Sequence, residues 1–309
     1  MVIFNIDENF KIQSNWKNGD FKAWLILDAN EINNLSTFFH EECIIECIDY
    51  KQCQRIDYYS DYIFLLINIL EQEEKQIISK EIDIFLSKDY IITVYKSNIK
   101  LLDEVIKDIS ENKNCLLLKE VKDPAIILYY LLDRLIIKNY NIISYLEEDS
   151  DKIELDILKE PNSKHLNSLL FIRREAYKLR KLLKPLRYIA DSLTLNENGV
   201  IKEECLIYFK KLNLRMEKLM AALDILSQEL AIVREAYESE IANKTNELMK
   251  VFTIITAIFL PLELITALFS MSFDNIPFKE CYLGFYVLII LLIVLAVLLL
   301  FIFKKKKIL

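Results

Sequence analysis

The sequence predicts an α+β fold, in which an α/β/α cytosolic domain is joined by a very long stalk helix to a hairpin of two membrane-spanning helices. Three observations lead to it. The first 165 residues mix strand-like and helix-like runs, as a mixed α/β domain does. The stretch from Glu203 to Leu260 has neither glycine nor proline, so one helix can run through it. Residues 251–303 are almost free of charge, as segments in lipid are.

The N-terminal domain is expected to occupy residues 1–165. Its strands are predicted where β-branched and aromatic residues gather between turn residues, at residues 21–27, 62–70, 82–86 and 90–95. Its helices are predicted at residues 31–39, 99–111 and 123–147. Helices that lie between strands indicate a sheet with helices on its faces.

Residues 166–250 are expected to form long stalk helices. The first ends at Asn196-Glu197-Asn198-Gly199, a sequence typical of a turn. The second can continue to Phe269 because Pro261 is tolerated inside a membrane helix. At about 1.5 Å per residue this helix is about 100 Å long. It would connect the N-terminal domain directly to the membrane.

Two segments can span a bilayer. Residues 251–269 carry one charge, at Glu263, and residues 282–303 carry none. Each is long enough to cross most or all of a hydrocarbon core about 30 Å thick. The second is apolar on every face, which a soluble domain rarely needs. Both are therefore predicted to lie in lipid.

Lysines place both ends of this hairpin on the cytosolic side. Lys244 and Lys250 precede the first span. The tail, residues 304–309, begins with a basic collar formed by Lys304, Lys305, Lys306 and Lys307. The N-terminus lacks the features of a signal peptide. We therefore expect an inner cell membrane protein with both termini and most of its mass in the cytoplasm, and a short outer loop at residues 270–281.

Composition excludes several other functions. The net charge is −7, whereas a nucleic-acid-binding protein presents a basic face. Only three glycines are present, and no phosphate-binding loop or nucleophile triad occurs, so no enzyme activity is predicted. Cys43, Cys47 and Cys53 follow His40 closely, but their spacing fits no zinc pattern. Buried free thiols in a reducing compartment are expected instead.

The first span has a polar stripe. Projected at about 100° per residue, its members and those of the preceding turn fall within an arc about 100° wide. The stripe consists of Asn246, Met249, Thr253, Thr256, Leu260, Glu263 and Ala267. Lipid cannot satisfy polar groups, so such a face turns toward protein or water. Two spans cannot enclose a water path, but a symmetric ring of copies can, with this stripe along its axis.

Glu263 allows two interpretations. A carboxylate within a bilayer costs about 2.5–3.5 kcal/mol on insertion scales and is a functional candidate by default. It can line the path, as its position on the arc with Thr256 and Leu260 favours. The alternative is a protonated or hydrogen-bonded glutamate at a structural helix contact.

Several motifs resemble the CorA metal ion transporter family. They are Glu235-Ala-Tyr, Asn243-Lys-Thr-Asn-Glu-Leu-Met-Lys, Val251-Phe-Thr-Ile-Ile-Thr-Ala-Ile-Phe-Leu-Pro-Leu, Phe85-Leu-Ser-Lys-Asp-Tyr-Ile-Ile-Thr-Val-Tyr, Asp133-Arg-Leu-Ile and the closing lysines. The resemblance implies a funnel-shaped homopentamer in which the first span lines the pore and the second faces lipid. The family's pore positions fall on Asn246, Met249, Phe252, Thr256 and Leu260. The three apolar ones would form constrictions that gate by dewetting.

The family's Gly-Met-Asn signature is replaced at the outer mouth by Ser270-Met271-Ser272. The Ser272 hydroxyl can still accept a hydrogen bond from a metal-bound water. Asp274 and Glu280 in the same loop can compensate for the acidic residue that the family usually has there. Glu263 stands where the family commonly has a hydroxyl residue. The candidate metal-binding residues are therefore Glu263 and Ser272.

Three functions follow from the resemblance. The first is a divalent cation transporter or channel with Mg²⁺ as the first candidate, since Mg²⁺ keeps its waters and suits a pore of hydroxyls and amides. The second is a transporter of Zn²⁺, Co²⁺ or Ni²⁺, as in the ZntB-like branch, in which Glu263 binds the ion or carries a proton. The third is a membrane scaffold or sensor that does not conduct.

Overall fold

The structure, a computed structural model, describes residues 1–305 except 36, 50–52, 74–75, 114 and 272–282. The chain forms two compact units. The first consists of Met1–Asp156 and Asn162–Arg234, and the second of Ile157–Pro161 and Glu235–Leu309.

The first unit contains a seven-stranded sheet in the order β2-β1-β3-β7-β6-β5-β4. Its strands are β1 (Val2–Asn5), β2 (Lys11–Gln13), β3 (Ala23–Asp28), β4 (Arg55–Tyr58), β5 (Ile63–Glu73), β6 (Gln76–Leu86) and β7 (Tyr90–Tyr95). Neighbouring strands are antiparallel except β3 and β7, which are parallel and pair Ala23 with Tyr90. The buried strands are rich in Ile, Leu and Phe, so their side chains form a core on both faces of the sheet.

The helical elements are η1 (Ile32–Leu35), α1 (Glu41–Ile48), α2 (Lys100–Ser110), α3 (Leu116–Glu120), α4 (Pro124–Lys159), α5 (Ser163–Leu195), α6 (Glu203–Ser270) and α7 (Gly284–Lys305). Asn162 caps α5, since its side-chain oxygen accepts the backbone N–H groups of Lys164 and His165. Asn196 ends α5 in the left-handed conformation, with φ of 49°. The break predicted at residues 196–199 is confirmed.

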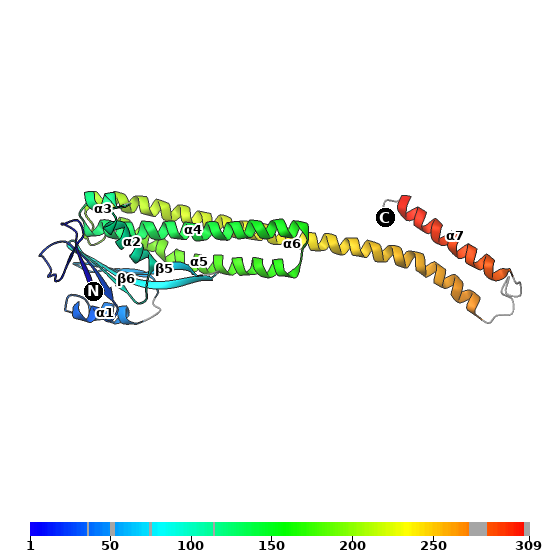
Figure 1. The fold of residues 1–309 in the computed structure, drawn as a ribbon, viewed down its shortest axis with the longest axis horizontal. Helices are drawn as coiled ribbons and strands as arrows, with labels where there is room; N and C mark the ends of the chain where they lie inside the picture. The colour runs from blue at the N-terminus through cyan, green and yellow to red at the C-terminus, as the bar shows by residue number, and fades with distance from the viewer. Residues whose placement is uncertain (36, 50–52, 74–75, 114, 272–282, 306–309) are drawn as a thin grey trace. The chain divides into compact units, whose positions relative to one another are not determined.

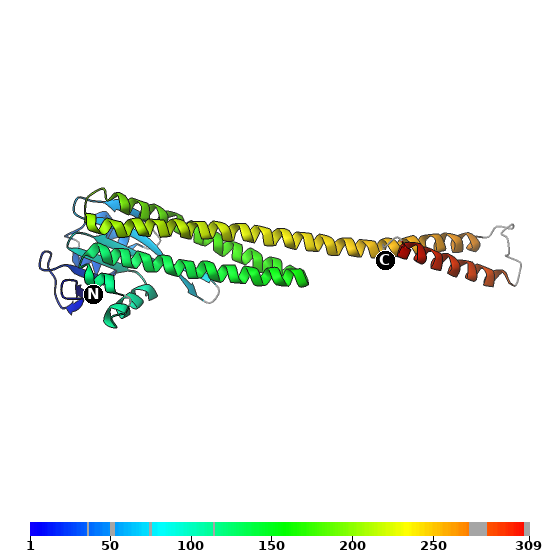
Figure 2. The same ribbon diagram turned by 90° about the horizontal axis from the view of Figure 1, so that it is seen from above.

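The sheet lies between α1 and the long helices (Figure 1, Figure 2). On one face, Cys43, Ile44 and Cys47 of α1 join the core cluster of the strands. On the other face, hydrogen bonds tie α5 to the sheet and to the residue that precedes β4. The Gln54 side chain donates to the Leu182 carbonyl at 2.7 Å, the Tyr58 hydroxyl donates to the Ser192 carbonyl at 2.6 Å, and the Ile77 N–H donates to the Glu175 carboxylate at 2.9 Å. This is the α/β/α arrangement that the sequence predicts.

Some predicted elements differ from the observed ones. The helix expected at residues 31–39 is wrong, because only Ile32–Leu35 forms a 3-10 turn and the α-helix lies at Glu41–Ile48. Asn33 and Asn34 interrupt the expected helix, and asparagine favours turns. The helix expected at 123–147 continues to Lys159, so the acidic residues beyond Tyr145 are helical.

Within the first unit α4, α5 and α6 pack through apolar side chains and ion pairs. Arg187 of α5 contacts Glu217 of α6 at 2.6 Å, and Arg215 of α6 pairs with Asp133 of α4. Asn139 of α4 differs from the apolar and ion-paired side chains among these three helices. Its side chain is fully buried, and neither amide atom has a hydrogen-bond partner within the described part of the chain.

Replacing Asn139 with leucine is expected to stabilise the first unit by about 1–3 kcal/mol, since the variant removes an unsatisfied buried amide. The urea midpoint, followed by the fluorescence of Trp16 and Trp24, measures this change. Asn141→Leu, at an exposed position of the same helix, serves as the control and should leave the midpoint unchanged. A lower midpoint for Asn139→Leu would show that the amide is satisfied, for example by water.

Candidate functional site

The polar stripe lies on the part of α6 that belongs to the second unit. Its residues are spaced alternately three and four positions apart, from Asn246 to Ala267. This spacing keeps side chains on one face of a helix. All stripe residues are exposed in the single chain, with Met249 at 59% and Leu260 at 61%. The residues predicted for the site therefore form one continuous exposed face.

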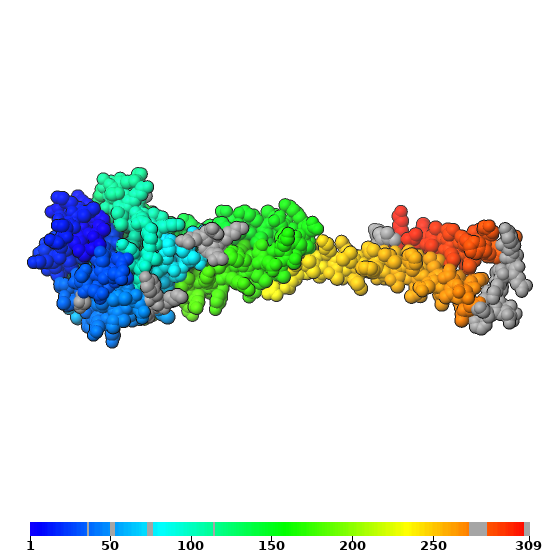
Figure 3. All heavy atoms as spheres, turned by 60° about the horizontal axis from the view of Figure 1, so that its bottom comes forward, coloured from blue at the N-terminus to red at the C-terminus, as the bar shows by residue number. Residues whose placement is uncertain are grey.

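Helix α7 runs back alongside α6 (Figure 2, Figure 3). Reduced exposure marks the face of α6 that it covers, which carries Ile254, Ala257, Ile258, Pro261, Leu262, Ile265 and Phe269. On α7 the corresponding residues are Gly284, Leu288, Leu292, Leu295, Ala296, Leu299 and Phe303. At about 100° per residue, the covered face of α6 lies about 150° from the stripe. The stripe therefore points away from α7.

Both helices have the length and composition of a membrane span. Their most apolar windows have mean hydropathies of 2.2 for α6 and 3.5 for α7, and they are 6% and 0% buried. A soluble core helix would be mostly buried. The exposure of so much apolar surface on both helices agrees with the sequence prediction that they lie in lipid.

A shallow groove brings part of the stripe together. It is lined by Met249, Phe252, Thr253, Thr256, Ala257, Leu260 and Pro261. Five of these were predicted from the sequence, and Ala257 and Pro261 were not. Asn246, Glu263 and Ala267 lie on the same helix outside the groove. A signal for the missed pair exists in the sequence, because a proline within a helix has no N–H to donate to the carbonyl four residues earlier, which here is that of Ala257.

The two threonines of the groove present acceptors. The hydroxyl of Thr253 donates to the Met249 carbonyl at 2.7 Å, and that of Thr256 donates to the Phe252 carbonyl at 2.9 Å. Because each hydroxyl hydrogen is used within the helix, only oxygen lone pairs remain for a ligand. Oxygen acceptors suit a cation or the hydrogens of its bound water. Met249, Phe252 and Leu260 surround them with apolar surface.

Glu263 lies one turn beyond the groove and is exposed. Its backbone carbonyl accepts the hydroxyl of Thr266 at 2.9 Å. Its carboxylate makes no ion pair or hydrogen bond with the residues that the structure describes. Among those residues no group of three or more His, Cys, Asp or Glu side chains could hold a metal ion. In one chain, Glu263 is thus an unpaired acidic group on an otherwise neutral stripe.

The outer-mouth predictions are described only in part. Ser270 ends α6, and Met271 follows it with 47% exposure. Ser272, Asp274 and Glu280 lie outside the described residues. In the basic collar, Lys304 and Lys305 form the last turn of α7, where positive charge is favourable for the helix dipole. Lys306 and Lys307 also lie outside the described residues.

Comparison with known proteins identifies the family. Residues 22–305 match the family described as CorA-like Mg²⁺ transporter protein. The chain is 24% identical over 282 residues to the cobalt/magnesium transport protein CorA of Thermotoga maritima, covering 90% of this chain and 80% of that protein. It is 24% identical over 204 residues to the divalent cation transporter CmaX of Pseudomonas aeruginosa, covering 66% and 60%.

The fold agrees with a solved structure of the same family. The CorA magnesium transporter from Methanocaldococcus jannaschii superposes with a TM-score of 0.85 at 18% identity, and the match covers 98% of this chain and 97% of that one. The match includes the sheet, the long helix and the apolar C-terminal helices, so the predicted fold class and the resemblance are both confirmed. The chain belongs to the CorA-like Mg²⁺ transporter protein family.

Proposed function

We propose that the chain is one subunit of a divalent cation transporter or channel, with Mg²⁺ as the first candidate ion, and that the ion passes along the polar stripe of α6. One observation carries the proposal. The stripe is exposed and faces away from α7, so in a ring of copies α6 lines the axis while α7 faces lipid. We therefore propose that the protein is not an enzyme and that the divalent ion is the substrate it transports.

The chemistry of the groove supports a hydrated ion. Mg²⁺ releases its waters reluctantly, and the hydroxyl oxygens of Thr253 and Thr256 can accept hydrogen bonds from those waters. Met249, Phe252 and Leu260 would form apolar constrictions, which close by dewetting. Asn246 would contribute a polar ring on the cytosolic side of them. The outer mouth, with Ser270, Met271 and Ser272, would receive the hydrated ion with the help of Asp274 and Glu280.

The membrane arrangement follows from the lysines. We propose that both termini lie in the cytoplasm, because Lys304 and Lys305 end α7 and basic flanks mark that side. Residues 1–165 then form the cytosolic domain, residues 166–250 the stalk, residues 251–269 and 282–303 the two spans, and residues 304–309 the basic tail. Glu263 would lie deeper in the path than Ser272.

We propose a homopentamer that uses α6 as its seam. Four exposed apolar residues of α6 lie at multiples of seven positions from stripe residues. They are Ile207, Leu214, Ile225 and Ile232, with exposures of 54%, 65%, 53% and 60%. A heptad spacing of apolar residues is typical of helices that pack against copies of themselves.

Replacing Ile232 with glutamate is expected to weaken the assembly, because a carboxylate would be buried at each copy of the seam. Native mass spectrometry of the full chain in detergent should show pentamers for the unchanged protein and smaller species for Ile232→Glu. Leu155→Glu, an exposed apolar position on α4 with 59% exposure, is the matched control and should stay pentameric. Monomers or dimers in the unchanged protein, in several detergents, would contradict the proposal.

Two other functions have a specific feature in their favour. Glu263 favours a transporter of Zn²⁺, Co²⁺ or Ni²⁺, because a carboxylate can bind the ion or carry a proton. Replacement of the signature by Ser270-Met271-Ser272 favours a scaffold or sensor that does not conduct.

Ion flux into liposomes holding the purified protein distinguishes these functions. Mg²⁺, Zn²⁺, Co²⁺ and Ni²⁺ are tested in turn at two pH values. We expect Mg²⁺ flux that empty liposomes lack. Preference for a transition metal with a pH-dependent rate would favour the second function. No flux of any of the four ions would contradict transport and leave the scaffold.

A further inference from the structure

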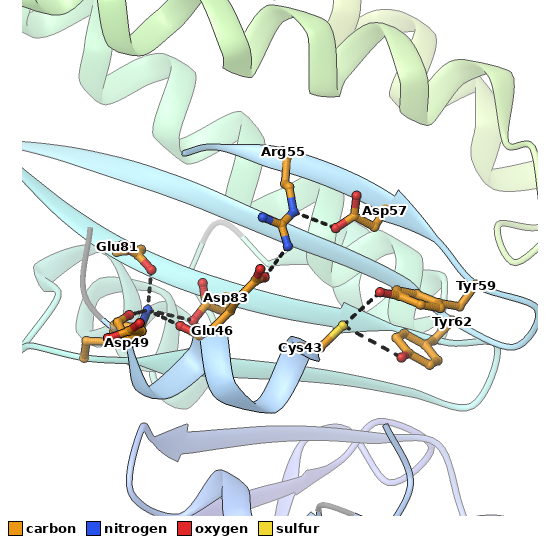
Figure 4. Close-up of polar contacts among 10 residues, drawn as sticks. Cys43, Glu46, Asp49, Arg55, Asp57, Tyr59, Tyr62, Glu81 and Asp83 are labelled. Carbon is orange, nitrogen blue, oxygen red and sulfur yellow. Dashed lines mark hydrogen bonds and ion pairs between the residues drawn. The ribbon is translucent and has the colours of Figure 1, made fainter. Parts of the chain in front are cut away.

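Four oxygen atoms surround the ammonium group of Lys96 where the end of α1 meets strand β6. Figure 4 shows the residues that supply them, which are Glu46, Asp49, Glu81 and Asp83. The Nζ atom donates to the backbone carbonyls of Glu46, at 2.7 Å, and Asp49. It also donates to the carboxylate of Glu81 and lies 3.5 Å from Oδ2 of Asp83. We refer to these four oxygens as the cage. They join the C-terminal end of α1 to the sheet.

The cage is buried and rich in negative charge. The side chains of Asp83, Lys96 and Glu81 are 0%, 2% and 8% exposed. Neither carboxylate oxygen of Asp83 accepts a hydrogen bond from the described residues. Buried carboxylates are costly unless a cation neutralises them. Two carboxylates therefore share one ammonium group, and Asp83 still has unused acceptor positions.

The neighbouring charges are already paired. Arg55 of β4 pairs with the carboxylates of Glu46 and Asp57, as Figure 4 shows. The negative charge that faces Lys96 from the sheet is thus that of Glu81 and Asp83. From α1, the last carbonyls of the helix, which carry the negative end of the helix dipole, and the buried thiol of Cys47 face Lys96.

Carboxylate and carbonyl oxygens are also the ligands of hard divalent cations in proteins. We propose that the cage is a hard-cation site that Lys96 fills from within, and that it binds a divalent cation such as Mg²⁺ or Ca²⁺ once the ammonium group is removed. The tethered ammonium makes occupancy of this site, and with it the anchoring of α1, independent of the divalent ion concentration. The inference concerns the first unit alone and does not depend on the proposed transport function.

Cys47 provides the readout. It is fully buried on the inner face of α1, so it reacts with an alkylating reagent only when α1 leaves the sheet. Burial also raises the pKa of the Cys47 thiol, with Asp83 adding to the effect. Burial also raises the pKa of Asp83 to about 7, against the opposing effect of Lys96, so every sample is held at one fixed pH, pH 8.

The test compares the full chain in detergent with its Lys96→Met variant. Alkylation of Cys47 by a maleimide is followed by mass spectrometry of its peptide, with MgCl₂, CaCl₂ or NaCl at equal ionic strength. Without divalent ions the variant should react about tenfold faster or more, since the cage has lost its cation. Millimolar Mg²⁺ or Ca²⁺ should restore slow alkylation, whereas the unchanged protein should not respond to either ion.

Two variants make the test specific. Lys96→Met with Asp83→Asn removes one carboxylate and should abolish the effect of the divalent ions. Lys80→Met, which removes a lysine of β6 that pairs with Glu71 of β5 at 2.8 Å, should leave the alkylation of Cys47 slow under all conditions. If Lys96→Met does not accumulate, Lys96→Gln takes its place. Two results would overturn the proposal. Cys47 of the Lys96 variant could react fast both with and without the divalent ions, or it could react as slowly as in the unchanged protein under all conditions.

Discussion

Replacing Glu263 with glutamine is expected to change the ratio of the fluxes of two ions by about tenfold, which corresponds to about 1.4 kcal/mol, or to remove the pH dependence of the flux. On the proposed path each copy would contribute one such carboxylate, and its charge would attract cations in a medium of low dielectric constant. If Glu263 carries a proton during transport, as the second candidate function requires, the flux through the unchanged protein should vary with pH. The variant has a neutral amide of the same shape at every pH.

The measurement is flux of Mg²⁺ and Zn²⁺ into liposomes between pH 5 and pH 8. Glu247→Gln is the control, because Glu247 is exposed on α6 but lies about 100° away from Asn246 around the helix. An unchanged profile in Glu263→Gln would return Glu263 to a structural role at a helix contact.

Replacing Asp83 with asparagine is expected to stabilise the first unit strongly at pH 8 and very little at pH 4. Burial raises the pKa of this carboxyl from 3.8 to about 7. The folded state therefore holds a proton that the unfolded state has released, and stability falls as the pH rises from about 4 to about 7. A shift of this size corresponds to roughly 4 kcal/mol at the high-pH end. Asparagine does not ionise, so the variant should lose this dependence.

Urea unfolding of the full chain in detergent, followed by tryptophan fluorescence, measures the effect. Both tryptophans, Trp16 and Trp24, lie in the first unit. Asp89→Asn, at an exposed position beside β7, should behave like the unchanged protein. A difference between Asp83→Asn and the unchanged protein that is constant from pH 4 to pH 8 would contradict this account.

The sequence predicted those strands whose side chains show the expected pattern. Strands β3, β5 and β7 are rich in β-branched, aromatic and leucine residues, and the sequence predicted each of them. Strand β6 was predicted only from Ile82 but begins at Gln76, since Lys80 and Glu81 resemble a polar turn. These charges lie in the sheet because Glu81 is paired with Lys96, which is distant in sequence. Strand β4 was missed for a similar reason, as Arg55 is paired with Glu46.

The sequence predicted the part of the candidate site that follows from the regular spacing of residues along α6. The stripe from Asn246 to Ala267 follows from spacing alone, and the structure describes all of it as exposed. The position of α7 behind it was not predictable from periodicity, because α7 is apolar on every side. Ala257 and Pro261 were missed because their part in the groove depends on the backbone and not on a polar side chain.

The central claim is that the stripe, and not the opposite face of α6, lines the ion path. The direct measurement is block of divalent cation flux by a charged methanethiosulfonate in variants that lack the native cysteines. Thr256→Cys lies on the stripe and Ile258→Cys lies on the face toward α7, about 160° away around the helix. We expect the reagent to block flux through Thr256→Cys and to leave Ile258→Cys unaffected. Block at Ile258→Cys alone, or equal block at both, would contradict the proposed path.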